Sequence, residues 1–125
     1  MYEFSLTRSV NNAVLSLCKQ SGWGRVRHIV VKIGGMRKVN PELMAFAFNV
    51  ISQGTPTEGA SLAVMILPVI FRCRSCGRRA ESEETEFACP LCGSRDVDLL
   101  SGLELGIELI EVEGFVGFMD NDDDE

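Results

Sequence analysis

Apolar side chains recur at helical spacing from Phe4 to about Ser21, which predicts an amphipathic helix with one buried stripe. Gly22 follows as a plausible stop, because glycine readily adopts the left-handed conformation that ends many helices. From Val26 to Ile33 the period changes to two, which predicts a strand. The helix stripe consists of Leu6, Val10, Ala13, Val14, Leu17 and Cys18, and the buried face of the strand consists of Ile29, Val31 and Ile33.

A second helix is predicted from the residues that precede its apolar positions. Asn40 can cap the free N–H groups of the first turn, Pro41 suits the first helical position, and Glu42 favours the positive end of the helix dipole. Gly54 is expected to end this helix. Its apolar surface is expected to consist of Leu43, Met44, Phe46, Ala47, Val50 and Ile51.

The second half of the chain predicts two long strands on either side of a cysteine-rich segment. Ser61 to Phe71 reads as one largely buried strand, in which Pro68 must lie at an edge or a bulge. Within the cysteine segment, residues 80–85 read as a charged loop. A closing strand is then predicted from the alternation of Leu103, Leu105, Ile107 and Leu109.

This order of elements predicts an α/β fold in which a small mixed sheet packs with two helices and carries an inserted four-cysteine zinc module. We expect residues 1–71 plus 97–119 to form the α/β domain and residues 72–96 to form the zinc-binding module. The six residues 120–125 contain five acids and are expected to be a solvated acidic tail.

Four of the five cysteines form two pairs with a two-residue gap, Cys73 with Cys76 and Cys89 with Cys92. Each gap lets both sulfurs reach one ion from a tight turn, and two such turns supply the four thiolates that structural zinc prefers. A redox dithiol and an iron–sulfur site are the alternatives for these ligands. Cys18 is expected to be a small buried hydrophobe.

Size and charge limit the possible partners and compartments. The chain has 125 residues, 46% of them hydrophobic, and a net charge of −6, which argues against nucleic-acid binding. The start of the chain lacks a secretory pattern, and its longest apolar run, Leu62 to Phe71, is too short for a membrane span. We therefore expect a cytoplasmic protein that binds neither membrane nor nucleic acid.

Two further groups of residues have a structural and a functional interpretation. Five arginines surround the cysteine pairs, and they either solvate the module and balance the thiolates or dock onto an acidic partner. They are Arg72, Arg74, Arg78, Arg79 and Arg95. His28 is the sole histidine and is expected at a strand surface, so no Ser–His or Cys–His catalytic arrangement is predicted. The chain is therefore not expected to be an enzyme.

From about Met1 to Val112 the chain resembles the hydrogenase nickel-incorporation accessory proteins of the HypA/HybF family. The resemblance rests on both Cys-x-x-Cys-Gly pairs and on three further stretches, Glu3-Phe4-Ser5-Leu6, Val30-Val31-Lys32-Ile33-Gly34 and the helix from Pro41 with Phe46-Ala47-Phe48. It implies a nickel metallochaperone for the maturation of [NiFe]-hydrogenase, with a structural zinc site. It also implies two partners, a maturation GTPase and the hydrogenase large subunit.

Two positions depart from the family pattern. Members typically begin Met-His-Glu with a nickel-binding histidine at position 2, where this chain has Tyr2, and Asn40 stands where some relatives have aspartate. A phenol is a poor nickel ligand at neutral pH, so the resemblance leaves the N-terminal amine of Met1, nearby backbone nitrogens and the carboxylate of Glu3. The alternative is a zinc-containing adaptor of the same fold that binds a maturation partner without carrying nickel. Either protein is expected as a monomer or a dimer.

Overall fold

The computed structural model describes residues 2–82 and 88–118, and these form two compact units. The first unit contains Val39–Met65, the chain up to Val31 and the chain from Gly106 onward. The second unit contains Lys32–Lys38 and Ile66–Leu105. The chain therefore passes between the units several times, and the second unit is inserted into the first.

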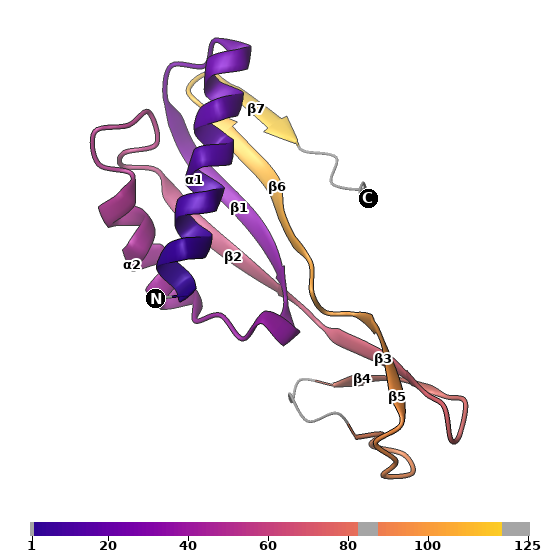
Figure 1. The fold of residues 1–125 in the computed structure, drawn as a ribbon. Helices are drawn as coiled ribbons and strands as arrows, with labels where there is room; N and C mark the ends of the chain where they lie inside the picture. The colour runs from indigo at the N-terminus through magenta and orange to yellow at the C-terminus, as the bar shows by residue number, and fades with distance from the viewer. Residues whose placement is uncertain (1, 83–87, 119–125) are drawn as a thin grey trace. The chain divides into compact units, whose positions relative to one another are not determined.

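The first unit consists of two helices and a sheet (Figure 1). The helices are α1 (Tyr2–Ser21) and α2 (Pro41–Ile51), and they pack against one another. The sheet has the order β2-β1-β6-β7, with β6 and β7 antiparallel. Its strands are β1 (Val26–Gly34), β2 (Ser61–Leu67), β6 (Leu105–Val112) and β7 (Phe115–Phe118). This arrangement confirms the predicted α/β class.

Helix α1 buries most of the predicted stripe. Leu6, Val10, Val14 and Cys18 are buried, whereas Ala13 is exposed and two polar residues, Thr7 and Asn11, take part in the core. Thr7 donates its hydroxyl to the carbonyl of Glu3 at 2.6 Å, and Asn11 Oδ1 accepts a 2.6 Å hydrogen bond from buried Thr57. The Thr7 hydroxyl and the Asn11 side-chain oxygen are therefore hydrogen-bonded, which offsets the cost of burying them.

Helix α2 begins as predicted. Asn40 has extended backbone geometry, and its side-chain oxygen accepts a hydrogen bond from the Leu43 amide at 3.1 Å. The predicted apolar surface was wrong at two positions, because Phe46 is 59% exposed and Val50 is 45% exposed. The core is instead formed by Met44, Ala47 and Phe48, which lie on one face of the helix.

The second unit contains an antiparallel three-stranded sheet and a small core of its own. The sheet has the order β4-β3-β5, formed by β3 (Val69–Cys73), β4 (Arg79–Ser82) and β5 (Val97–Ser101). A short 3-10 helix, η1, spans Gly35–Arg37. The buried cluster is formed by Val69, Phe71, Cys73 and Cys89, with Met36, Ala80, Val97 and Leu99 packed against it.

Three details of the second half differ from the sequence prediction. The single strand expected from Ser61 to Phe71 is two strands, β2 and β3, which belong to different sheets and are separated by Pro68. Proline lacks the N–H that a sheet ladder needs, so the break falls there. Strand β4 lies in the segment expected to be a loop, and β5 was not predicted. The expected acidic tail, 120–125, lies outside the described residues.

The segment Lys32–Lys38 joins the second unit through close backbone contacts. The amide of Gly34 donates to the carbonyl of Glu104 at 2.8 Å, and the amide of Met36 donates to that of Gly102 at 2.9 Å. A Cβ on Gly34 would lie 2.1 Å from the backbone of Gly102, so this approach requires glycine. None of the helices in the described ranges has the length and apolar character needed to cross a membrane.

Candidate metal centre

Two tight turns with the same hydrogen-bond pattern present the cysteine pairs. In the first turn, which follows β3, the Gly77 amide donates to the Cys73 carbonyl at 2.9 Å. In the second, the Gly93 amide donates to the Cys89 carbonyl at 2.7 Å. Both glycines have positive φ, 76° and 80°, which a residue with a Cβ adopts only with strain. The glycine after each pair therefore closes the turn and aims both sulfurs to one side.

The four cysteine sulfur atoms lie close together between these turns. The Sγ atoms of Cys73, Cys76, Cys89 and Cys92 all lie within 4.8 Å of one another. Cys73 Sγ is 3.6 Å from Cys92 Sγ, and Cys76 Sγ is 3.8 Å from Cys89 Sγ. A tetrahedron of sulfurs about 2.3 Å from a zinc ion has edges of about 3.8 Å, so the spacing fits a four-coordinate ion. All four thiols are free rather than joined in disulfides.

Local hydrogen bonds favour the thiolate form of two of the ligands. The Cys76 amide lies 3.4 Å from the sulfur of Cys73, and this hydrogen bond is the main cause that lowers the pKa of Cys73 to about 6. Burial acts to raise the pKa of Cys89, but amide donors from Leu91 and Cys92 lower it overall. For Cys92, the Ser94 amide acts to lower the pKa, yet the neighbouring thiols, led by Cys73, raise it to about 11. Four crowded thiols thus need a cation before all of them ionise.

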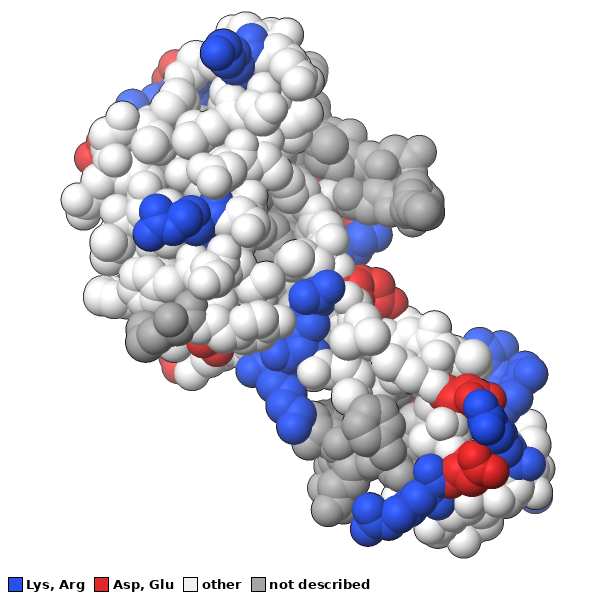
Figure 2. Space-filling model, viewed as in Figure 1, with Lys and Arg blue, Asp and Glu red and all other residues white. Residues whose placement is uncertain are grey.

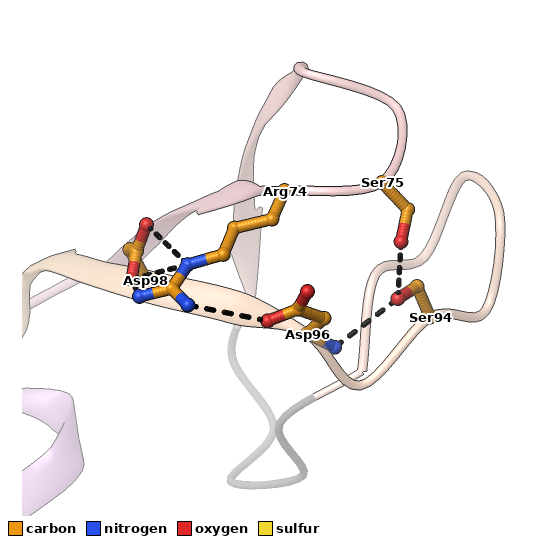
Figure 3. Close-up of polar contacts among 5 residues, drawn as sticks. All are labelled: Arg74, Ser75, Ser94, Asp96 and Asp98. Atoms are coloured by element: carbon orange, nitrogen blue, oxygen red, sulfur yellow. Dashed lines mark hydrogen bonds and ion pairs between the residues drawn. The ribbon is translucent and has the colours of Figure 1, made fainter.

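A polar network joins the two turns outside the sulfur cluster (Figure 3). The hydroxyls of Ser75 and Ser94 lie 2.8 Å apart, and Ser94 Oγ accepts from the Asp96 amide at 3.1 Å. Arg74 donates to both carboxylate oxygens of Asp98, at 2.6 to 3.0 Å, and lies 3.6 Å from Asp96. These contacts bridge one turn to the other, so they hold the turns facing each other. Sequence spacing gave no signal for this network.

The structure places Glu3, one of the N-terminal candidates, at the start of helix α2. Glu3 Oε2 accepts a hydrogen bond from the Asn40 amide at 3.1 Å, although the two residues are 37 positions apart in the sequence. Tyr2 is 45% exposed, and Met1 lies outside the described residues. Glu3 and Asn40, which were selected for separate reasons, therefore lie side by side.

His28 takes part in a surface contact within the first unit. Its Nδ1 lies 2.6 Å from the hydroxyl of Ser61 on the neighbouring strand β2. In the described ranges, the single group of three or more His, Cys, Asp or Glu side chains close enough to share an ion is the cysteine quartet. His28 is not part of that group.

Together, the inserted unit and its four convergent thiols define a class: a small α/β protein that carries a four-cysteine metal centre. A family model described as "Hydrogenase/urease nickel incorporation, metallochaperone, hypA" matches residues 1–112. The chain belongs to this HypA family.

Individual relatives agree with the family match. The hydrogenase maturation factor HypA of Acidithiobacillus ferrooxidans is 34% identical over 113 residues, which cover 90% of this chain and all of the relative. The factor of the same name from Aquifex aeolicus is 33% identical over 90% of this chain and 98% of its own length. The solution structure of the Ni metallochaperone HypA from Helicobacter pylori shares the fold, with a TM-score of 0.61 and 20% identity over 88% of this chain and 96% of its own.

Proposed function

We propose that this protein carries nickel for the maturation of a [NiFe]-hydrogenase and holds a structural zinc ion between its two cysteine turns. Family membership over residues 1–112 supports the role in maturation. The observation that carries the zinc assignment is the convergence of four sulfur atoms within 4.8 Å. Four thiolates fill a tetrahedral coordination shell, so this centre has no open position for exchange or catalysis. We therefore assign it to folding and propose a carrier rather than an enzyme.

For the nickel cargo we propose a different set of ligands at the start of the chain. The carboxylate of Glu3 and the N-terminal amine of Met1 are the proposed ligands, together with backbone nitrogens of the first residues. The position of Glu3 supports this choice, because its carboxylate is held by a hydrogen bond from the Asn40 amide and lies only two residues along the chain from Met1. Tyr2 supplies a phenol where the family typically has an imidazole, so the proposed set does not use this side chain.

The proposed division of labour follows from these two sites. Residues 1–71 and 97–119 would handle nickel, residues 72–96 would hold zinc, and 120–125 would be an acidic tail. We further propose a cytoplasmic protein whose partners are a maturation GTPase and the hydrogenase large subunit. Free paired cysteines suit a reducing compartment.

Nickel titration of zinc-loaded protein tests the cargo site. The untagged chain is expected to bind one nickel ion with a dissociation constant of about 1 μM, or about −8 kcal/mol. A tag before Met1 should abolish this binding, because it converts the amine into an amide that cannot serve as the same ligand. The matched control carries the same tag after Glu125 and should bind normally. Equal nickel binding by both tagged proteins would contradict the assignment to the N-terminus, and no binding by the untagged chain would leave the adaptor function.

Metal analysis of cysteine variants tests the zinc centre separately. Cys92→Ser is expected to lose stoichiometric zinc, because a hydroxyl is a much weaker zinc ligand than a thiolate. Cys18→Ser is the control, since Cys18 is buried in helix α1 and belongs to the other unit. This control should keep its full zinc content even if its stability falls. Full zinc retention by Cys92→Ser would rule out the four-sulfur site.

A further inference from the structure

Basic residues are concentrated in the second unit of an otherwise acidic chain. The unit contains eight of the twelve Lys and Arg residues but only seven of the eighteen acidic residues. Figure 2 shows blue side chains on several sides of the part that holds β3 to β5, with red side chains between some of them. Between Val69 and Ser101 every basic residue is an arginine. Arginine presents a planar fork of donors that matches a carboxylate, whereas lysine presents a point charge.

Two of these arginines lie directly opposite one another in the sheet. Arg72 on β3 is the register partner of Arg79 on β4, and Asp98 on β5 is the partner of Arg72 on the other side. Opposed residues of antiparallel strands point to the same face, so this row shares one face of the sheet. The neighbouring row, Ala80, Phe71 and Leu99, packs in the core of the unit. The arginine row therefore faces outward.

The charges in this row do not balance. Like charges directly opposite in a sheet are destabilising, and both Arg72 and Arg79 are exposed. Asp98 is held by the forked hydrogen bonds from Arg74. No hydrogen bond or ion pair links the side chain of Arg72 or Arg79 to the described part of the chain. Among the described residues, the sheet thus maintains two guanidinium groups side by side without a partner at hydrogen-bond distance.

We propose that the Arg72–Arg79 pair binds an acidic segment of a partner protein. The Cβ atoms of directly opposed residues in a sheet lie about 5 Å apart. Carboxylates on adjacent turns of a helix have a similar spacing, and so do those on one side of an extended segment, so either arrangement can contact both guanidinium groups. The metal centre fixes this face, since β3 runs directly into Cys73. This docking role goes beyond nickel transport and does not depend on it, because none of the proposed nickel ligands contributes to the row.

An acidic protein fits this face better than a nucleic acid. Proteins that hold single strands combine a basic groove with exposed aromatic rings on which bases stack. Phe71 is the one aromatic residue of the second unit within the described ranges, and it is 1% exposed.

The test measures binding of a fluorescent hexaglutamate peptide to the full-length, metal-loaded protein. Binding should weaken as salt rises, since exposed charges are screened. The double variant Arg72→Gln with Arg79→Gln should bind about tenfold more weakly. The control is Arg8→Gln with Arg27→Gln, which removes the same charge from two exposed positions of the first unit. It should bind the peptide like the unmodified chain.

Three results would overturn the proposal. Equal losses in the test and control variants would attribute binding to net charge and overturn the site. Tighter binding of a single-stranded oligonucleotide of equal charge would overturn the choice of an acidic protein. Thermal unfolding provides a second readout: removal of a like-charge pair should leave stability unchanged or raise it. Lower stability with unchanged peptide binding would show that the arginines are structural and would overturn the proposal.

Discussion

At Gly34 the backbone passes so close to another backbone segment that a single added methyl group would clash with it. The carbon that alanine would add lies 2.1 Å from the carbonyl carbon and oxygen of Gly102, and neither is the end of a flexible side chain. The segment around Gly34 also donates hydrogen bonds to Glu104 and Gly102. The clash and the hydrogen bonds therefore occur in one place, and relieving the clash breaks the bonds.

We predict that Gly34→Ala lowers the free energy of unfolding by about 2–4 kcal/mol, because the two backbones must separate. Gly24→Ala is the matched control. Gly24 has no heavy atom within 4 Å of the added carbon and no positive φ, so this substitution should be neutral or stabilising by up to about 1 kcal/mol. Denaturant unfolding of both variants measures the difference. Equal stability of the two would show that the Gly34 contact does not form in solution.

At the scale of elements, the start of helix α2 combines a structural role with a position next to the proposed nickel ligands. The Asn40 side chain accepts from the Leu43 amide, and the Asn40 amide donates to the carboxylate of Glu3. The carboxylate also lies at the positive end of the helix dipole. A change at either side chain can therefore act through stability as well as through ligand chemistry, and the two effects must be separated.

Substitutions at Asn40 test the structural role. Asn40→Ala should lower the free energy of unfolding by about 1 kcal/mol, because the Leu43 amide loses its acceptor. Asn40→Asp should lose less stability than Asn40→Ala, because aspartate caps equally well and favours the helix dipole, although the neighbouring Glu3 carboxylate repels it. Thermal or denaturant unfolding of the two variants is the measurement. A loss of stability in Asn40→Asp as large as that in Asn40→Ala would contradict the capping role.

The sequence predicted the elements whose capping residues or hydrophobic alternation lie within the element itself. Asn40 and Pro41 mark the start of α2 from their own chemistry, and the alternation of Ile29 and Val31 marks β1. Strand β4 was missed because its sequence, Arg79 to Ser82, is mostly charged and polar, and it is held in the sheet by its pairing with β3. That pairing is set by tertiary structure, which a local pattern does not contain.

The same distinction applies to the candidate sites. The cysteines were identified by spacing because two ligands of one ion sit within a single turn. The contact between Glu3 and Asn40 joins residues 37 positions apart, and the local sequence around either residue does not predict it. The Arg72–Arg79 pair was visible as a cluster in the sequence. Its common face depends on the register of β3 and β4, which appears only in the structure.

At the scale of the whole molecule, acid should release the metal before it affects the body of the protein. The pKa of Cys73 is lowered from an ordinary 9.0 to about 6. A lowered pKa stabilises the folded unit above the ordinary value, and this contribution is lost as the pH falls through about 6. Protons compete with the metal for the same sulfurs, so metal affinity should fall as the pH drops below about 6, and release should follow at a lower pH, because the bound cation stabilises the thiolate. A zinc-sensitive dye read across a pH series measures this, and complete retention far below that pH would contradict it.

Removal of the metal at neutral pH should uncouple the two units, because they are stabilised differently. Both α-helices belong to the first unit, whose core contains large side chains such as Phe48, Ile29 and Met44. The core of the second unit is small, and two of its four buried residues, Cys73 and Cys89, are themselves metal ligands. A chelator should therefore leave the helical circular dichroism signal nearly unchanged while amide exchange accelerates in β3, β4 and β5. The control is the same chelator already saturated with zinc, which should change neither signal. If chelation abolished the helical signal in parallel with the exchange protection, the units would fold as one, and the metal would stabilise the whole chain.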